Sequence, residues 1–205
     1  MSLSGYGDNQ AEYDAIQGAV NAGVAFAVAA GNDSDDVENY SPAGFDNVLT
    51  VSALADFDGL ARGLGSPTCR NDQDDTLADF SNWGSAVDIA APGVCILSTF
   101  PIEQGGYGTI SGTSMASPHV AGALALLASA NKPSNATDVY NLYDQVTSAG
   151  KYNWTDDSDD GTTEQLLDVG TFVPALVSVG GGTDEPPACR PCLERGGIER
   201  CGCLP

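Results

Sequence analysis

The sequence predicts an α/β domain built on a parallel sheet, and three observations lead to this class. Apolar runs without polar alternation, such as residues 24–30, are typical of strands that are covered on both faces. Segments with apolar residues at helical spacing occur between and after these runs. The length of 205 residues, 42% of them hydrophobic, is enough for one domain with a core, or for one domain and a tail.

The first half of the chain contains one predicted helix followed by several buried strands. Residues 11–22 place Ile16 and Val20 at helical spacing and end before Gly23, a helix stop signal. The run at 24–30 is the first buried strand. Further strands are expected at residues 47–54, 87–91 and 96–99, with a polar loop at 63–75.

The second half begins with a buried helix at residues 114–129, which is rich in alanine and leucine. A further helix, started by Asn135, is expected at 136–142. An acidic loop at 153–161 and a short apolar stretch at 165–169 follow.

The composition changes after Gly180, and it predicts a division of the chain into three parts. Glycines and prolines come first, and four of the six cysteines then lie within residues 189–203. We expect a domain at 1–172, a linker at 173–188 and a cysteine-containing tail at 189–205.

The charge balance excludes two classes of partner. With 28 Asp and Glu against 7 Lys and Arg, the formal net charge is −21, so neither nucleic acid nor an anionic membrane surface is an expected partner. No apolar run approaches the roughly 20 residues of a membrane span. Met1 is followed by no basic and apolar leader, which taken literally indicates a cytosolic protein.

The most informative segment is residues 112–122, GTSMASPHVAG, in which Ser114 lies at the start of the buried helix. Backbone N–H groups and the positive end of the helix dipole favour an oxyanion at such a place. An ordinary buried helix with an N-terminal serine explains the same residues equally well.

This segment resembles the nucleophile motif of the subtilisin-like (subtilase, peptidase S8) serine proteases, and further blocks agree with it in order. These are SLSG at 2–5, VAAGN at 28–32, and FSNWG at 80–84 with DIAAPG at 88–93. NYSPA at 39–43 and ILST at 96–99 look most like the proteinase K branch. The resemblance implies that residues 1–172 are the C-terminal half of a catalytic domain whose parallel sheet has helices on both faces.

The resemblance assigns roles to individual residues. Ser114 matches the nucleophile that forms an acyl-enzyme with a polypeptide substrate, and Asn32 matches the side-chain donor of the oxyanion hole. Asp33 would lie at the rim of the first specificity pocket. The positions that match the substrate-binding segments are Ser2, Leu3, Ser4, Gly5, Ala29, Ala30, Gly31 and Tyr40.

The family's triad also requires an Asp and a His, and both motifs precede the SLSG strand. The one histidine, His119, lies five residues beyond Ser114, about 7.5 Å along the helix and about 140° around it, so it is expected to be a packing residue. We therefore expect a truncated fragment that lacks the N-terminal half, folds poorly and is inactive alone, from a secreted parent enzyme.

Two alternatives to this interpretation are kept. One is a short pseudoprotease that binds peptides without cutting them. The other is a serine hydrolase of the G-x-S-x-G type, which Ala116 and the absence of a downstream histidine nearly exclude.

The resemblance also implies a structural Ca²⁺ site. Its ligands would be the backbone carbonyls of Asp46 and Val48 and the carboxylate of Asp88, since Ca²⁺ prefers oxygen ligands. In the alternative, Asp88 is only a carboxylate at a strand end. The loop that starts at Asp156 lacks the Glu that an EF-hand requires at its twelfth position, Leu167, so a solvated loop is expected there.

Cys69 and Cys95 flank the FSNWG region and are expected to form one disulfide, with two free thiols as the alternative. The tail cysteines are too closely spaced for a zinc ribbon, so two disulfides or an unstructured end are expected instead. These tail residues are Cys189, Cys192, Cys201 and Cys203.

Overall fold

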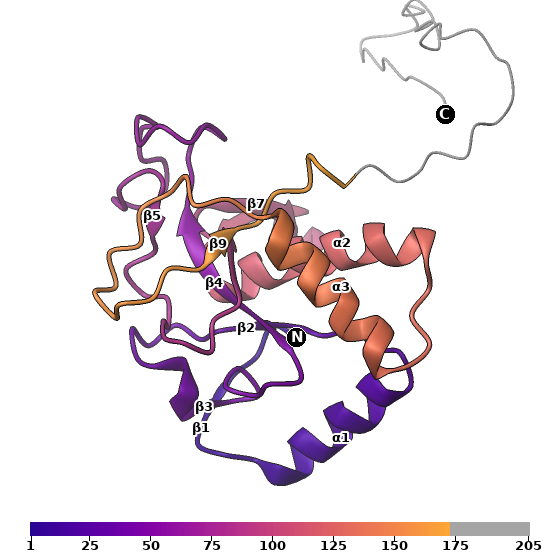
Figure 1. Ribbon diagram of the computed structural model, residues 1–205. Coiled ribbons are helices and arrows are strands. Elements are labelled where there is room, and N and C mark those ends of the chain that lie inside the picture. The colour runs from indigo at the N-terminus through magenta and orange to yellow at the C-terminus, as the bar shows by residue number, and fades with distance from the viewer. Residues whose placement is uncertain (173–205) are drawn as a thin grey trace, which may run out of the picture. The chain divides into compact units, whose positions relative to one another are not determined.

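A computed structural model describes residues 1–172 of the chain (Figure 1). The predicted linker at 173–188 and the cysteine tail at 189–205 lie outside the described residues. The elements, in chain order, are β1 (Gly5–Tyr6), α1 (Gln10–Asn21), β2 (Ala27–Ala29), the 3-10 helix η1 (Val37–Asn39), β3 (Tyr40–Ser41), β4 (Leu49–Ala55), β5 (Thr76–Leu77), β6 (Ile89–Pro92), β7 (Ile96–Thr99), the 3-10 helix η2 (Ile102–Gln104), β8 (Tyr107–Ile110), α2 (Thr113–Ala130), α3 (Ala136–Ala149) and β9 (Gln165–Leu166).

The main sheet has the strand order β2-β4-β6-β9, and all of these strands run parallel. The short strand β5 pairs antiparallel with β4. Every residue of β4 is buried, as its apolar run predicted. Residue 1 also lies beside β2, because the N–H of Ala29 donates to the carbonyl of Met1 at 3.0 Å. The predicted α/β class with a parallel sheet and packed helices is confirmed.

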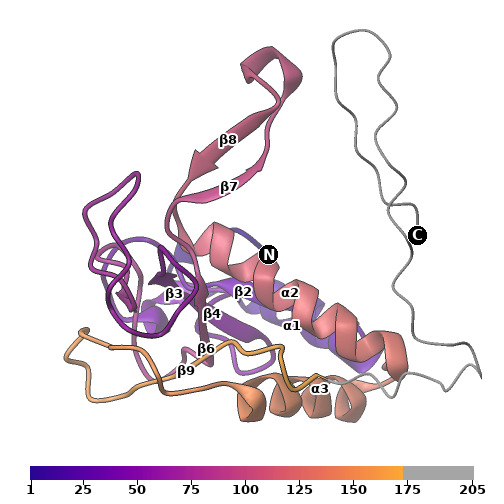
Figure 2. The same cartoon turned by 90° about the horizontal axis from the view of Figure 1, so that it is seen from above.

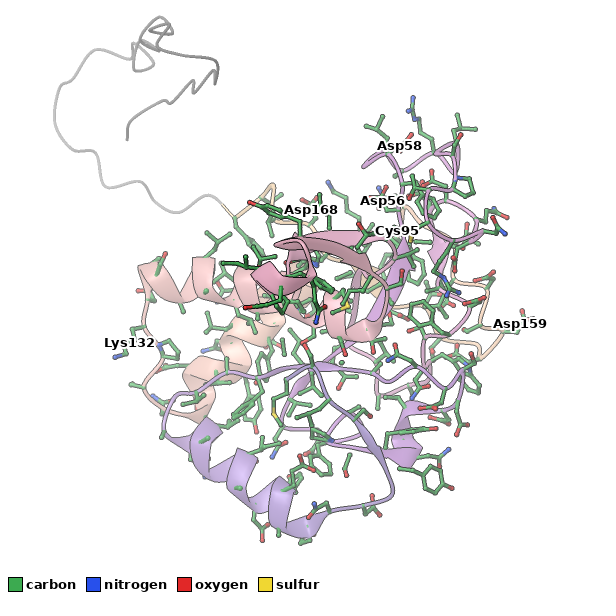
Figure 3. All side chains as sticks on the ribbon, turned by 180° about the vertical axis from the view of Figure 1, so that it is seen from behind. Asp56, Asp58, Cys95, Lys132, Asp159 and Asp168 are labelled. Atoms are coloured by element: carbon green, nitrogen blue, oxygen red, sulfur yellow. A yellow bond between two sulfur atoms is a disulfide. The ribbon has the colours of Figure 1, made fainter. Side chains whose placement is uncertain are left out.

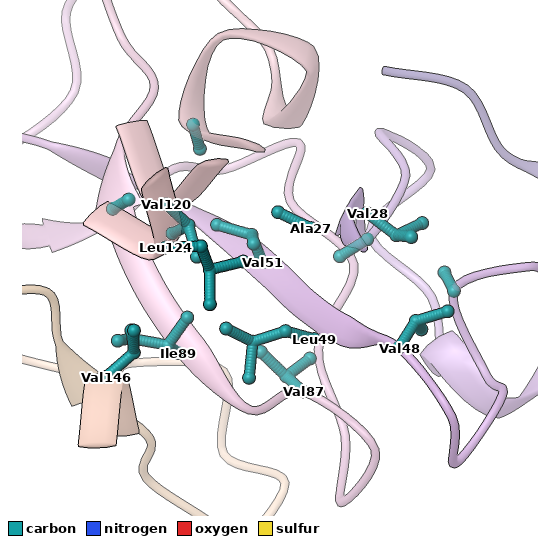
Figure 4. Packing of buried hydrophobic residues seen from close by; sticks show 14 of the residues in the cluster. Ala27, Val28, Val48, Leu49, Val51, Val87, Ile89, Val120, Leu124 and Val146 are labelled. Carbon is teal, nitrogen blue, oxygen red and sulfur yellow. The ribbon is translucent and has the colours of Figure 1, made fainter. Parts of the chain in front are cut away.

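Helix α2 packs across β2, β4 and β6. Its side chains Val120 and Leu124 meet Val51 of β4 in the main core (Figure 4). Successive side chains of a strand alternate between the two faces, so Leu54 points away from α2. It joins a second, smaller buried cluster with Trp154.

Helix α3 continues beyond its predicted end because its apolar stripe continues. Tyr143 and Val146 are buried, and the helix reaches Ala149. The expected start is confirmed: the Asn135 side chain accepts a hydrogen bond from the N–H of Asp138 at 3.1 Å.

Strands β7 and β8 form an antiparallel hairpin that projects from the rest of residues 1–172 (Figure 2). The sequence analysis predicted β7 and missed β8. The hairpin leaves and returns at one place, since the N–H of Gly112 donates to the carbonyl of Gly93 at 2.8 Å. Near its base a disulfide joins Cys69 to Cys95, the pair that the sequence favoured.

Candidate active site

Ser114 is the second residue of α2, so its backbone N–H lies outside the hydrogen-bond ladder of the helix. Its hydroxyl lies 3.4 Å from the carbonyl oxygen of Ser2, and the Ser2 hydroxyl donates to the carbonyl of Ser114 at 2.9 Å. Ser114 is half-buried. The Ser114 hydroxyl therefore lies beside Ser2, at the start of the chain.

Asn32 follows β2 and meets the start of α2. Its side-chain oxygen accepts hydrogen bonds from the N–H of Thr113 at 2.9 Å and from the Thr113 hydroxyl at 3.1 Å. Because the oxygen is engaged in this way, the amide NH₂ group is left to donate elsewhere. The structure thus brings the Asn32 amide and Ser114 together across 82 positions of sequence.

Thr113 is a site residue that the sequence analysis did not single out. It is fully buried, and its hydroxyl accepts a hydrogen bond from the N–H of Gly31 at 3.1 Å while donating to Asn32. One hydroxyl therefore fixes both the loop after β2 and the side chain of Asn32. Its position directly before Ser114 is the sequence feature that could have identified Thr113 as part of the site.

Asn82 is a second residue that was missed as part of the site. It is fully buried, donates to the carbonyl of Ala30 at 3.0 Å and accepts from the N–H of Asp33 at 2.9 Å. The loop that carries Asn32 is therefore held from both sides, by Thr113 and by Asn82. The FSNWG block contained Asn82, but nothing in the sequence indicated which loop it would contact.

A cavity of about 200 Å³ opens beside Ser114. It brings together half of the predicted substrate-binding residues, four of the eight, with Asn32 and Ser114. Its lining consists of Leu3, Ser4, Ala29, Gly31, Asn32, Asp33, Thr113 and Ser114.

The other predicted substrate-binding residues are not part of this lining. Gly5 lines a neighbouring hollow of about 410 Å³, which shares Leu3 and Ser4 with the cavity. Ala30 is buried beneath, with its carbonyl bound by Asn82. Tyr40 packs edge-on against Tyr6, and its hydroxyl donates to Asp35 at 3.3 Å.

The His119 ring contacts the backbone of its own helix. Its ring nitrogen Nδ1 lies 2.8 Å from the carbonyl oxygen of Met115, one turn back on the same helix. The residue is exposed, which differs from the packing role that was expected. His119 is the one histidine of the 205-residue sequence.

The residues predicted to bind Ca²⁺ lie near the start of β4. The carboxylate of Asp88 accepts a hydrogen bond from the N–H of Thr50 at 2.6 Å. Thr50 lies two positions after Val48 in the sequence. Asp88 keeps part of its surface exposed to solvent. Desolvation by the surrounding protein atoms nevertheless raises the pKa of its carboxyl group to about 6. A carboxylate oxygen is a ligand that Ca²⁺ prefers, so the chemistry of Asp88 fits such an ion. Asp46 is exposed, and one of its carboxylate oxygens accepts a hydrogen bond from Tyr13 at 2.9 Å.

A separate group of carboxylates lies in the loops after β4 (Figure 3). Oxygens of Asp56, Asp58 and Asp74 lie within 4.8 Å of one another. Backbone N–H groups already bind both oxygens of Asp74, at 2.8 and 2.6 Å, and Arg62 pairs with Asp58 at 3.1 Å. These hydrogen bonds and the ion pair account for the proximity of the three carboxylates.

Glu164 is a largely buried carboxyl group that the sequence analysis did not predict. Desolvation raises its pKa to about 7, although a hydrogen bond from the Ser52 hydroxyl acts in the opposite direction. It lines a hollow of about 430 Å³ together with Asp88.

Comparison with known proteins gives a consistent result. The subtilase family matches residues 1–165. The chain is 39% identical over 182 residues to the subtilisin-like proteinase Spm1 of Pyricularia oryzae, covering 89% of this chain and 30% of that protein. It is 44% identical over 151 residues to alkaline serine exoprotease A of Vibrio alginolyticus, covering 74% of this chain and 24% of that one.

A solved structure, that of a cold-adapted subtilisin-like serine proteinase, is similar with a TM-score of 0.63 and 39% identity. The similarity covers 82% of this chain and 52% of that chain. This chain thus spans about half of the solved relative and under a third of the two sequence relatives. None of the helices within residues 1–172 has the length and apolar character needed to cross a bilayer. The match over residues 1–165, the motifs and the shared fold agree, and the chain belongs to the subtilase family of serine peptidases.

Proposed function

We propose that Ser114 is the nucleophile of a peptide-bond hydrolase and that Asn32 is a donor of its oxyanion hole. The observation that carries this proposal is the meeting of the Ser114 hydroxyl and the Asn32 side chain at one open cavity. A polypeptide carbonyl bound there would lie within reach of both groups. The substrate class is polypeptide, as it is for the named proteases of the family.

The chemistry follows from the local geometry. The Ser114 oxygen attacks the scissile carbonyl carbon, and negative charge develops on the carbonyl oxygen. The Asn32 amide and the Ser114 N–H stabilise this charge, and Thr113 holds the amide in position. In a subtilisin, loss of the corresponding side-chain donor lowers kcat by about 10²–10³. The serine proton requires a base, and the 205 residues offer no imidazole within reach.

The triad Asp and His would come from polypeptide that is not part of these 205 residues. One feature supports a docking place for it. Ala121, Gly122, Ala125 and Leu126 form an exposed apolar face on α2, directly after the nucleophile turn. Exposed apolar surface of this kind indicates an interaction site. The 205-residue chain alone would then be inactive.

A complementation experiment tests the proposal. The chain is co-expressed with the N-terminal part of the catalytic domain of the Vibrio alginolyticus relative, and casein hydrolysis and fluorophosphonate labelling are measured. We expect labelling only in the complemented sample, its loss in Ser114→Ala, and a decrease in kcat of about 10²-fold in Asn32→Leu. Casein digestion by the chain alone that is lost in Ser114→Ala would refute the proposed missing base.

A second candidate function is a peptide-binding module without catalysis, and the absent base favours it. The result that would identify this function is a complemented protein that binds peptides at the cavity and never forms an acyl-enzyme. The same labelling experiment distinguishes the two functions.

A structural Ca²⁺ ion is also proposed, held by the carbonyls of Asp46 and Val48 and by the Asp88 carboxylate. Ligand binding to the folded state alone raises stability, by about 2.7 kcal/mol at 100 times Kd. Millimolar Ca²⁺ should therefore raise Tm in the wild-type chain and leave Asp88→Asn unchanged. An equal shift in both proteins would exclude Asp88 as a ligand.

We further propose an extracellular location for the intact protein. The Cys69–Cys95 disulfide supports it, because disulfides persist in oxidising compartments. Mass spectrometry of these two cysteines in material from culture medium and from cells tests this assignment.

A further inference from the structure

A hollow of about 650 Å³ lies apart from the cavity beside Ser114 and shares no lining residue with it. Residues on both sides of β5 form it together with the acidic loop that follows α3. The residues that matter for its chemistry are Arg70, Asp72, Asp79, Trp83 and Asp157. A space of this size fits a small organic group, such as a side chain of a bound polypeptide.

Asp72 contributes a buried carboxylate with one oxygen left unused. Its side chain is 3% exposed, and one of its oxygens pairs with Nε of Arg70 at 2.9 Å. The other oxygen, Oδ1, is buried and has no hydrogen-bond partner among residues 1–172. Because a buried acceptor without a donor is costly, a donor group bound in the hollow would stabilise this carboxylate.

The lining of the hollow has an excess of negative charge. It contains the carboxylates of Asp72, Asp79 and Asp157 and a single cation, Arg70. Arg70 pairs with the first two of these carboxylates, and Asp157 forms no ion pair in the part of the chain that the structure describes. The three carboxylates do not come close enough together to hold one metal ion. The charge and the size of the hollow therefore favour an organic cation.

Arg70 shows which kind of cation this surface holds. Its guanidinium carbon lies 5.0 Å from the centroid of the Phe80 ring, and its nitrogens donate to Asp72 and Asp79. An aromatic ring and a carboxylate oxygen remain available in the lining, namely the Trp83 indole and Oδ1 of Asp72. A planar guanidinium can stack on such a ring while it donates to a carboxylate, whereas an ammonium group is a point charge.

We propose that this hollow binds an arginine side chain of a partner polypeptide, which donates to the free oxygen of Asp72 and stacks on Trp83. Asp157, which is exposed on the acidic loop, adds a second negative charge. An uncharged side chain of the same length would leave the excess negative charge without compensation. The site is separate from Ser114, so the proposal goes beyond the proposed function and does not depend on it.

Nuclear magnetic resonance of the 205-residue chain tests this binding. The chain has two tryptophans, so isotope labelling of the indole nitrogens gives two N–H signals, and Trp83→Phe identifies the signal of Trp83. N-acetyl-arginine amide is titrated in, and the lysine and citrulline derivatives are compared with it, because citrulline has nearly the shape of arginine without its charge. We expect a saturable shift of the Trp83 signal with arginine, about threefold weaker binding of lysine and at least about tenfold weaker binding of citrulline.

Two variants test the carboxylates, and two controls separate the causes. Asp72→Asn should weaken arginine binding by about tenfold, and the exposed Asp157→Asn by about threefold. Asp144→Asn makes the same charge change on the exposed surface of α3 and should bind like the wild type. Ser114→Ala should also bind like the wild type, so a failure of the proposed catalysis would leave this result unchanged.

Circular dichroism establishes that each variant is folded. If Asp72→Asn does not fold, Asp157→Asn and the citrulline comparison decide the question. The proposal is overturned if arginine does not move the Trp83 signal, if citrulline or lysine binds as tightly as arginine, or if the folded Asp72 and Asp157 variants bind arginine like the wild type.

Discussion

Gly31 separates β2 from Asn32 and has a φ of +112°, a backbone conformation that residues with a side chain rarely adopt. A Cβ at this position would lie 2.3 Å from the amide nitrogen of Asn82. The same residue donates its N–H to Thr113. Backbone freedom at one position therefore allows the loop to contact both residues that hold it.

We expect Gly31→Ala to lower the free energy of unfolding by about 2 kcal/mol, through strain at positive φ and the clash with Asn82. Chemical denaturation measures this change. Gly18→Ala is the matched control: Gly18 is exposed in α1, and a Cβ there meets nothing within 4 Å. That variant should gain about 0.5–1 kcal/mol, because alanine favours helix. Equal effects at the two positions would contradict the role given to Gly31.

The Glu164 carboxyl predicts a pH dependence of stability. Its pKa is raised from 4.5 when unfolded to about 7 when folded, so the folded state binds the proton more tightly. Its stabilising contribution is complete below about pH 4.5 and is lost as the pH rises through about 7. Denaturation at about pH 5 and pH 8, in the presence of a chelator, should differ by up to about 3 kcal/mol from this group.

Glu164→Gln should remove most of that difference. The slope that remains would belong to Asp88, whose pKa is raised in the same direction. An unchanged slope in Glu164→Gln would show that this carboxyl is not desolvated.

Among the elements, the chain segment closed by the disulfide is the clearest target for a test. Cys69 and Cys95 are 26 positions apart, and the bond restricts the unfolded chain. By the chain-entropy relation, replacing both residues with serine should lower the free energy of unfolding by about 3.5 kcal/mol. Denaturation of the wild type with and without reductant should reproduce this difference, and reductant should leave the double variant unchanged. A loss below about 1 kcal/mol would contradict the entropic account.

The secondary-structure elements also show which parts of the fold sequence patterns can predict. The runs behind β2, β4 and β6 predicted buried strands because burial on both faces leaves an uninterrupted apolar pattern. Strand β5 has two residues, too few for any periodicity, and β8 reads YGTI, with exposed side chains that give no buried face. The motifs identified Ser114 and Asn32, whereas Asn82 joined the site only through tertiary contacts.

At the scale of the whole molecule, charge is the dominant feature. The excess negative charges of a chain with a net charge of −21 repel one another in the compact state. At an ionic strength of 0.1–0.15 M, salt screens the repulsion between charges that are more than about 8–10 Å apart. Raising NaCl from about 10 mM to 500 mM in the presence of a chelator should add about 1 kcal/mol, or roughly 2–4 °C in Tm. Calorimetry at matched pH measures the shift, and a lower Tm in salt would show that attractive ion pairs dominate.

The closed base of the β7–β8 hairpin has a consequence for how such proteins diverge. Gly93 and Gly112 are hydrogen-bonded to each other, so the chain between them begins and ends at a single anchor point directly before Thr113 and Ser114. Residues gained or lost at the tip, around η2, leave that anchor where it is. Evolution or an engineer can therefore lengthen, shorten or exchange the hairpin as a module without moving Thr113 and Ser114.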